Sequence, residues 1–298
     1  MSTVTHHFFA PLCNARGSFI GIDLGSPFRI EKWSAAKIRR LLKELDDLPD
    51  YEIDFRLEHN HCINDNQRYG FVVLAEEQST DSDEWVSVHI RFHNIEQLME
   101  QKLTLLRLFH DGNVRVLGNY WYSFEGKRIE LESAGNPTGS ILKNTCYLRR
   151  NRLGALNAFL ARKKLPFAKS FLQLAFESYE ESQKVQSLHL QFLSLMISLE
   201  SLFNVSAQDL RYRISRGVAV LLGRDIEHCE VIMKSLKNLY DKRSQLVHTG
   251  KIDCIGHYDV EMLRIYVRKA ILAVDELKIE KEGLARKLNA AGFGASIT

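Results

Sequence analysis

An arginine and a histidine stand five residues apart near the end of a predicted helix, in the run Tyr240–Gly250. A histidine with a pKa of about 6.5 can take up or release a proton at neutral pH. A guanidinium can neutralise the charge that grows on a phosphate under attack. Arg243 and His248 therefore carry the side chains that phosphodiester cleavage without a metal requires. Ser244 is a third candidate, because its hydroxyl can bind phosphate or orient the histidine.

The helix predicted over 226–249 has an apolar stripe, and Arg243 falls on it. The other members of the stripe are Cys229, Ile232, Leu236, Leu239 or Tyr240, and Val247. Arginine in such a stripe needs an anionic partner or a functional cleft. Five residues on an ideal helix are separated by about 140° and about 7.5 Å. The Arg243 and His248 side chains thus converge only if the arginine extends along the axis or the last turn loosens.

A second predicted helix, 184–204, is apolar nearly all round and carries one carboxylate in its core segment, Glu200. A lone buried carboxylate needs a cation, which Arg243, Arg213 or Arg216 can supply. Two interpretations of Arg243 stay open, a catalytic group and a structural partner of Glu200. His248 also has two, a catalytic group and a helix-end side chain that binds the last carbonyl groups. Asp241 is a further supporting candidate.

Charge differs between the two halves of the chain. The whole sequence of 298 residues has 40 basic and 37 acidic side chains, a net charge of +3. Residues 1–150 hold 18 basic and 21 acidic residues (18 − 21 = −3), and the rest hold 22 and 16 (22 − 16 = +6). A basic half is compatible with a polyanionic ligand. The candidates for contacts with an RNA backbone are Arg213, Arg216, Lys242 and Lys251, and a solvated basic face is the alternative.

The sequence predicts a mixed α+β domain over 1–148 and an all-α domain over 149–298. In the first, β-branched and aromatic runs predict strands, and amphipathic runs predict helices, the first capped by Ser34. The strands are expected at 68–76, 85–92 and 114–124, and the helices at 34–47 and 94–110. A Gly-rich turn at 135–139 marks the approach to the boundary. The second domain is expected to have six helices, with Gly223 and Gly250 as C-terminal caps and the apolar helix 184–204 at the centre of the bundle. Their expected ranges are roughly 150–163, 167–182, 184–204, 208–222, 226–249 and 258–287.

The five cysteines are scattered, odd in number and without a CxxC pair. This predicts a reduced, cytoplasmic chain with no disulfide. No run is long and apolar enough to span a membrane, and no secretory signal is visible at the N-terminus. The segment His59–Cys62, with Asp54 and Glu58 nearby, suggests a metal site, but no second cluster of ligands matches it. We therefore expect no metal and no cofactor. His6 and His7 are too isolated to interpret.

Four aromatic residues alternate along one predicted strand, at Tyr120, Trp121, Tyr122 and Phe124. Such a strand can present a surface on which nucleic-acid bases stack. Packing of its two faces against the core explains the same pattern more simply.

Four ordered segments of the second half resemble a known family. They are Phe167–Glu180, Ser198–Phe203, Tyr212–Gly223 and Leu239–Gly250. Together they are similar to the HEPN domain, and most to its Apea-like branch from bacterial phage-defence proteins. The run Lys102–Gly112 is also similar to a segment that lies upstream in such proteins. The rest of the first 148 residues resembles no family that we can name.

The resemblance implies a metal-independent endoribonuclease that uses 2′-OH transesterification and an R-x4-H motif built across a homodimer of the helical domain. Arg243, His248 and Ser244 would be its catalytic residues, and the chain would act as an anti-phage or toxin effector. The N-terminal domain would then sense a trigger or bind a partner such as an antitoxin. The alternative is a non-catalytic scaffold for dimerisation or nucleotide binding. A third reading, an enzyme in the N-terminal domain, has no catalytic set behind it.

Overall fold

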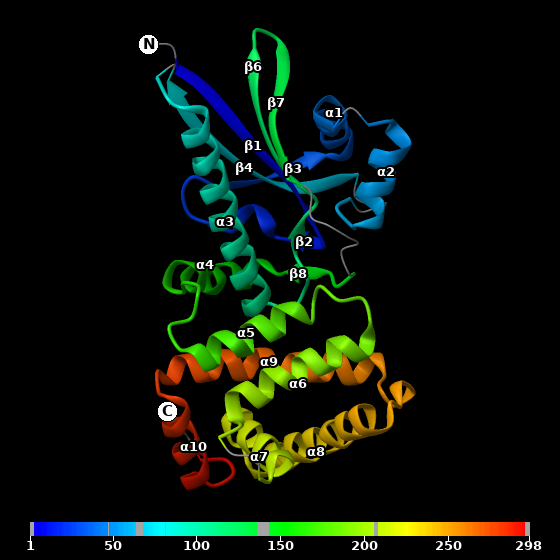
Figure 1. The fold of residues 1–298 in the computed structure, drawn as a ribbon, viewed down its shortest axis with the longest axis vertical. Coiled ribbons are helices and arrows are strands. Elements are labelled where there is room, and N and C mark those ends of the chain that lie inside the picture. The colour runs from blue at the N-terminus through cyan, green and yellow to red at the C-terminus, as the bar shows by residue number, and fades with distance from the viewer. Residues whose placement is uncertain are drawn as a thin grey trace. The chain divides into compact units, whose positions relative to one another are not determined.

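The computed structural model describes residues 3–46, 48–63, 68–80, 82–135, 143–205 and 208–295. The chain divides into two compact units, Met1–Lys164 and Leu165–Thr298 (Figure 1). The first is mixed α+β and the second is helical, as the sequence predicts. The division comes after residue 164 and not after residue 148, because helix α4 (Leu153–Arg162) packs on α3 of the first unit. The Gly-rich turn, beyond Gly135, lies outside the described residues.

A six-stranded antiparallel sheet forms the centre of the first unit. Its strand order is β3-β4-β1-β6-β7, and β5 pairs with the end of β1. The strands are β1 (Thr3–Cys13), β3 (Arg29–Ser34), β4 (Tyr69–Thr80), β5 (Arg115–Val116), β6 (Asn119–Glu125) and β7 (Arg128–Gly135). Two short strands, β2 (Ala15–Gly17) and β8 (Cys146–Leu148), pair in parallel beside it. The long strand β1 was not foreseen from the sequence.

Helices pack on both faces of this sheet. The first unit contains α1 (Ala35–Asp46), α2 (Asp50–His59), α3 (Trp85–Phe109) and α4, with short 3-10 helices at Phe19–Gly21 and Arg150–Arg152. On one face, Phe92 of α3 stacks on Trp121, with ring centroids 4.0 Å apart. On the other, Phe9 and Trp33 join the apolar core that α1 and α2 complete. The side chain of Ser34 accepts a hydrogen bond from the Lys37 backbone, which confirms the predicted cap of α1.

One predicted strand is wrong, because residues 85–92 form the first part of α3. The alternation of Trp85, Val86, Val88 and Ile90 favours a strand, but Val88 and Phe92 are also four residues apart. Both are buried, while Trp85, Val86 and Ile90 are exposed. The helical period therefore determines which side chains reach the core. The aromatic strand is confirmed as mostly core: Tyr120, Trp121 and Tyr122 are buried, and only Phe124 is exposed.

A disulfide joins Cys13, at the end of β1, to Cys62, in the turn after α2. The expectation of a chain without disulfides is therefore wrong. The backbone N–H of Asn14 donates to the carbonyl of His61 at 3.1 Å, which holds the two segments together. Both cysteines are fully buried. The pairing arises from tertiary packing between segments 49 residues apart, so the cysteine spacing in the sequence carries no signal of it.

The second unit is a bundle of six α-helices in the described residues. They are α5 (Ser170–Glu181), α6 (Leu188–Phe203), α7 (Leu210–Leu222), α8 (Ile226–Thr249), α9 (His257–Leu277) and α10 (Lys281–Ala290), with a 3-10 turn at Ile252–Cys254. Helix α6 contacts each of the other five, which confirms its predicted central place (Figure 1). The single helix expected at 258–287 is divided in two, because Lys278 adopts a left-handed conformation after Leu277. No helix in the described residues is long and apolar enough to cross a membrane.

Candidate functional site

Helix α8 carries the candidate catalytic residues, and local signals define its two ends. The Asp225 carboxylate accepts a hydrogen bond from the His228 backbone at 2.7 Å, which caps the first turn. Gly250 ends the helix with φ +67°, a conformation that glycine adopts without steric cost. The buried stripe of α8 consists of Cys229, Ile232, Leu236, Leu239 and Leu246. Val247, expected on this stripe, is instead 49% exposed.

Arg243 faces α6 and forms an ion pair with Glu200. The Nη2 atom of Arg243 lies 3.4 Å from Oε1 of Glu200, and both side chains are largely buried. This pairing selects Arg243 among the three cations that the sequence offered. Oε1 of Glu200 is buried without a hydrogen bond within the described residues, so the two charges are in contact but not well aligned. Burial raises the pKa of the neighbouring Tyr240 hydroxyl, and the charge of Glu200 adds to the rise while Arg243 opposes it.

His248 occupies the last turn of α8 and is exposed to solvent. Its ring has no hydrogen-bond partner in the parts of the chain that the structure describes. Its separation of five residues from Arg243 directs the two side chains about 140° apart on the helix surface. The chain thus holds Arg243 against α6 and leaves His248 open, and no contact within the described residues brings the two groups together.

The two neighbouring candidates differ in their contacts. Ser244 is partly buried, and its hydroxyl makes no hydrogen bond within the described ranges. Asp241 accepts a hydrogen bond from the Arg211 guanidinium at 2.6 Å, in an ion pair that is about half exposed. Arg211 is thereby linked to α8, whereas Ser244 remains available for a ligand.

Two of the four candidate RNA contacts are engaged in structural interactions. The Arg216 guanidinium donates to the carbonyls of Leu288 at 2.5 Å and Ala291 at 2.7 Å, at the C-terminal end of α10. Lys242 donates to both carboxylate oxygens of Asp259, at 2.8 and 2.7 Å. These bonds hold α10 and α9 in place. Neither side chain can bind phosphate without giving up these contacts.

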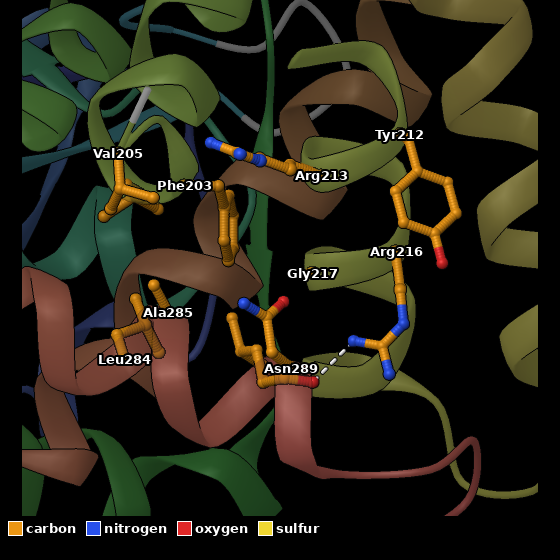
Figure 2. Close-up of a pocket in the computed structure, with 11 residues that line it drawn as sticks. Phe203, Val205, Tyr212, Arg213, Arg216, Gly217, Leu284, Ala285 and Asn289 are labelled. Atoms are coloured by element: carbon orange, nitrogen blue, oxygen red, sulfur yellow. Dashed lines mark hydrogen bonds between the residues drawn. The ribbon is translucent and has the colours of Figure 1, made fainter. Parts of the chain in front are cut away.

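Arg213 lines a small cavity of about 40 Å³ between α6, α7 and α10. Figure 2 shows its guanidinium above the Phe203 ring, with Leu284 and Asn289 on the opposite side and Arg216 reaching across to α10. The cavity is too small for a nucleotide as it stands, since drug-sized ligands occupy several hundred cubic ångströms. Lys251, the fourth candidate, is exposed just after α8.

The residues around His59–Cys62, the segment that suggests a metal site in the sequence, have other contacts. The His59 ring stacks on Phe55, Cys62 is in the disulfide, and Asp54 forms an ion pair with Arg39. His59 is the last residue of α2, and Asn60–Cys62 lie in the turn after it. Within the described residues, no group of three or more histidine, cysteine, aspartate and glutamate side chains is placed to hold a metal ion.

A buried polar chain in the first unit was missed by the sequence analysis. Nδ1 of His6 lies 2.5 Å from Oε2 of Glu132, and Nε2 lies 2.6 Å from Oγ of Ser79. Strand pairing produces this contact: β1 lies between β4, which carries Ser79, and the β6–β7 hairpin, which carries Glu132. The three residues are far apart in the sequence, so no local pattern could have grouped them.

Comparisons with models of protein families, with curated proteins and with solved structures find no match to this chain.

Proposed function

We propose that the helical unit is a HEPN-like endoribonuclease that cleaves RNA without a metal ion. The supporting observation is the arrangement of α8, which keeps Arg243 partly buried beside Glu200 and leaves the His248 ring open to solvent in the last turn. An imidazole that makes no hydrogen bond within the described residues can exchange a proton with a substrate. The resemblance of four segments to the HEPN family supports the same assignment.

In the proposed reaction, the 2′-hydroxyl oxygen attacks the adjacent phosphorus atom and the bond from phosphorus to the 5′ oxygen breaks. His248 takes the proton of the 2′-hydroxyl or gives a proton to the 5′ oxygen. The Arg243 guanidinium offsets the charge that develops on the phosphorane oxygens. Ser244 binds a phosphate oxygen or orients the histidine. The products are a 2′,3′-cyclic phosphate and a free 5′-hydroxyl.

The proposed active form is a homodimer. Within one chain, Arg243 and His248 diverge, so a second copy would bring an arginine and a histidine to a shared cleft. Two exposed apolar side chains flank the candidate residues, Ile197 on α6 at 47% and Val247 on α8 at 49%. Exposed apolar groups of this kind favour association with a partner.

The proposed setting is an anti-phage or toxin effector whose N-terminal α+β unit senses a trigger or binds an antitoxin. A cytoplasmic location belongs to the same proposal. The Cys13–Cys62 disulfide weighs against that location, because disulfides are rare in the reducing cytosol.

A second candidate function is a non-catalytic HEPN-like scaffold for dimerisation or nucleotide binding. The ion pair between Arg243 and Glu200 favours it, because the guanidinium already has an anionic neighbour within the chain. A structural arginine would need no substrate to balance its charge.

The test is cleavage of mixed RNA by the purified full chain in the presence of EDTA. Wild type is compared with Arg243→Ala and His248→Ala, and the matched controls are Arg286→Ala and His257→Ala, at exposed positions on α10 and α9. Cleavage that is lost in the first pair, kept in the controls and leaves 2′,3′-cyclic phosphate ends supports the nuclease. Equal cleavage by all five proteins overturns it. Absence of cleavage in all of them, with dimers still formed, favours the scaffold.

A further inference from the structure

A polar groove of about 480 Å³ lies between α7 and α8, apart from the cavity under Arg213. The residues that line it are Arg211, Glu230, Met233, Lys234, Lys237, Asn238, Asp241 and Phe293. Three of them are cations and two are carboxylates. Asp241 is neutralised by its 2.6 Å bond to Arg211. The charge left in the groove is therefore that of the two lysines against Glu230.

Neither lysine has an anionic partner within the described residues. Lys234 is exposed and Lys237 is partly buried, and neither forms an ion pair there. By contrast, Lys242 and Lys169 of the same unit form ion pairs, with Asp259 and Glu280 respectively. The two lysines therefore leave positive charge in the groove, which an anionic ligand can neutralise. The groove thus has the chemistry of a phosphate-binding surface, with the Asn238 amide as an additional donor.

The groove runs along the same face of α8 as His248. Residues 230, 234, 238, 241, 245 and 248 are separated by three or four positions, so they share one side of the helix. Lys237 lies beside them. From Lys234 to His248 the helix rises about 21 Å. Arg243 projects from the opposite side toward α6, so this face leads to the histidine and not to the arginine of the same chain.

We infer that this groove binds the phosphodiester backbone of single-stranded RNA next to the bond that is cleaved, with Lys234 and Lys237 as phosphate contacts. The inference rests on the proposed nuclease function and names the path by which its substrate approaches His248. The lining of the groove reaches Asp241, and His248 lies about two turns further along the same face of α8, so a chain of phosphates bound in the groove would lead toward a proton-transfer group. Affinity for such a chain comes from cations along its backbone and falls as salt rises.

The test measures RNA binding in the His248→Ala background, so that the probe is not cleaved. The probe is a fluorescently labelled single-stranded RNA of mixed sequence, roughly 12 nucleotides long. The double variant Lys234→Gln/Lys237→Gln is compared with Lys269→Glu, which makes the same change in net charge at an exposed position on α9. Melting temperature and oligomeric state are checked for both.

The expected result is a Kd about tenfold higher for the groove variant, which corresponds to a loss of about 1.4 kcal/mol in binding free energy. The Kd of Lys269→Glu should rise less than about twofold. The slope of log Kd against log salt should also fall by about 1.4, since each contact to single-stranded RNA contributes about 0.7. Equal RNA affinity and an equal salt slope in the two variants overturn the assignment of this groove as an RNA-binding surface.

The outcomes separate this inference from the function on which it rests. If cleavage by wild type needs Arg243 and His248 but the groove variant binds RNA like its control, the groove assignment is wrong and the nuclease stands. If neither residue is needed for cleavage, the nuclease proposal fails, and the groove no longer leads to an active site. If the chain binds no RNA at all, both fail.

Discussion

His6 in the first unit and His248 in the second differ in burial and in hydrogen bonding. His6 is 4% exposed, and each ring nitrogen has a partner, Glu132 on one side and Ser79 on the other. His248 is exposed, and its ring has no hydrogen bond among the described residues. An imidazole with both nitrogens occupied holds neighbouring strands together, whereas an open one can transfer protons. The difference identifies His248, rather than the buried and hydrogen-bonded His6, as the imidazole that is available for chemistry.

The arginines make the same contrast. Arg107 is fully buried, and its guanidinium donates to the Val114 carbonyl at 2.8 Å, to Glu100 at 2.7 Å and to Thr104 at 2.6 Å. Arg243 is 26% exposed and meets Glu200 only at 3.4 Å. A guanidinium with several well-aligned bonds is fixed by them. A loosely held one can exchange its carboxylate for a phosphate at lower cost.

The largest expected effect is on catalysis. His248→Ala should lower the cleavage rate about 10²- to 10⁴-fold, which is the usual contribution of a general acid or base. His6→Ala should leave the rate per folded molecule within about twofold, because its ring is buried and both ring nitrogens are engaged within the first unit. Single-turnover cleavage, normalised to the folded fraction from circular dichroism, measures both. A loss of activity in folded His6→Ala would show that His6 is not purely structural and would contradict the proposed difference between the two histidines.

Removal of the buried arginine should have the largest effect on stability. Arg107→Leu should lower the free energy of unfolding by about 3–5 kcal/mol, because it leaves the Val114 carbonyl without this donor and the Glu100 charge without its closest cation. Arg243→Leu should cost about 1 kcal/mol or less, since its pair is partly solvated. Urea denaturation of both variants gives the comparison. Similar losses would show that Arg243 is as firmly structural as Arg107.

Features of the fold that depend on neighbouring residues in the chain could be predicted from the sequence. Helix α8 was predicted with its observed limits, because Gly250 and the spacing of its apolar residues are local signals. Glu200 was recognised as needing a cation for the same reason, since one charge in an apolar helix is visible in the sequence.

The features that the sequence did not reveal depend on contacts between distant segments. The His6 chain and the Cys13–Cys62 disulfide arise only when β1 takes its place in the sheet. Residues 85–92 were assigned to a strand because their apolar side chains alternate. The same residues also fit the helical spacing, and only the packing of Phe92 on Trp121 selects the helix. The contacts that engage Arg216 and Lys242 are likewise tertiary.

A smaller loss of stability is expected from the His6 chain. His6→Ala should lower the free energy of unfolding by about 2–3 kcal/mol, because it leaves buried polar partners without bonds and opens a space beside Phe92. His7→Ala is the matched control on the same strand. Its ring is more exposed and lies 3.6 Å from Glu76, so a change of about 0.5 kcal/mol is expected. Equal effects at the two positions would contradict the assignment of His6 as a structural link.

Acid should weaken the first unit through Glu100. Burial alone would raise the pKa of this carboxyl, but the charges of Arg107 and Arg115 and the hydrogen bond from Arg107 hold it below its usual range. A carboxyl with a lowered pKa in the folded state stabilises the fold above its unfolded pKa of about 4.5, and that contribution is lost as pH falls through the lowered value. Glu100→Gln should therefore lose less stability than wild type between about pH 5 and pH 3. Thermal melts of both proteins across this pH range measure the difference. If Glu100 contributed nothing, the melting temperatures of wild type and Glu100→Gln would fall in parallel.

The smallest expected effect tests whether Glu200 competes with substrate for Arg243. Glu200→Gln keeps the shape of the side chain and removes its charge, so Arg243 would have no anionic neighbour to exchange for phosphate. RNA should then bind about two- to fivefold more tightly in the His248→Ala background, at a cost in stability of about 1 kcal/mol or less. Glu227→Gln, exposed in the first turn of α8, is the matched control. Weaker RNA binding in Glu200→Gln would mean that the carboxylate positions Arg243 for the substrate and does not compete with it. In that case Arg243 would resemble Arg107, whose position is fixed by its carboxylate partner, and would not be an open group like His248.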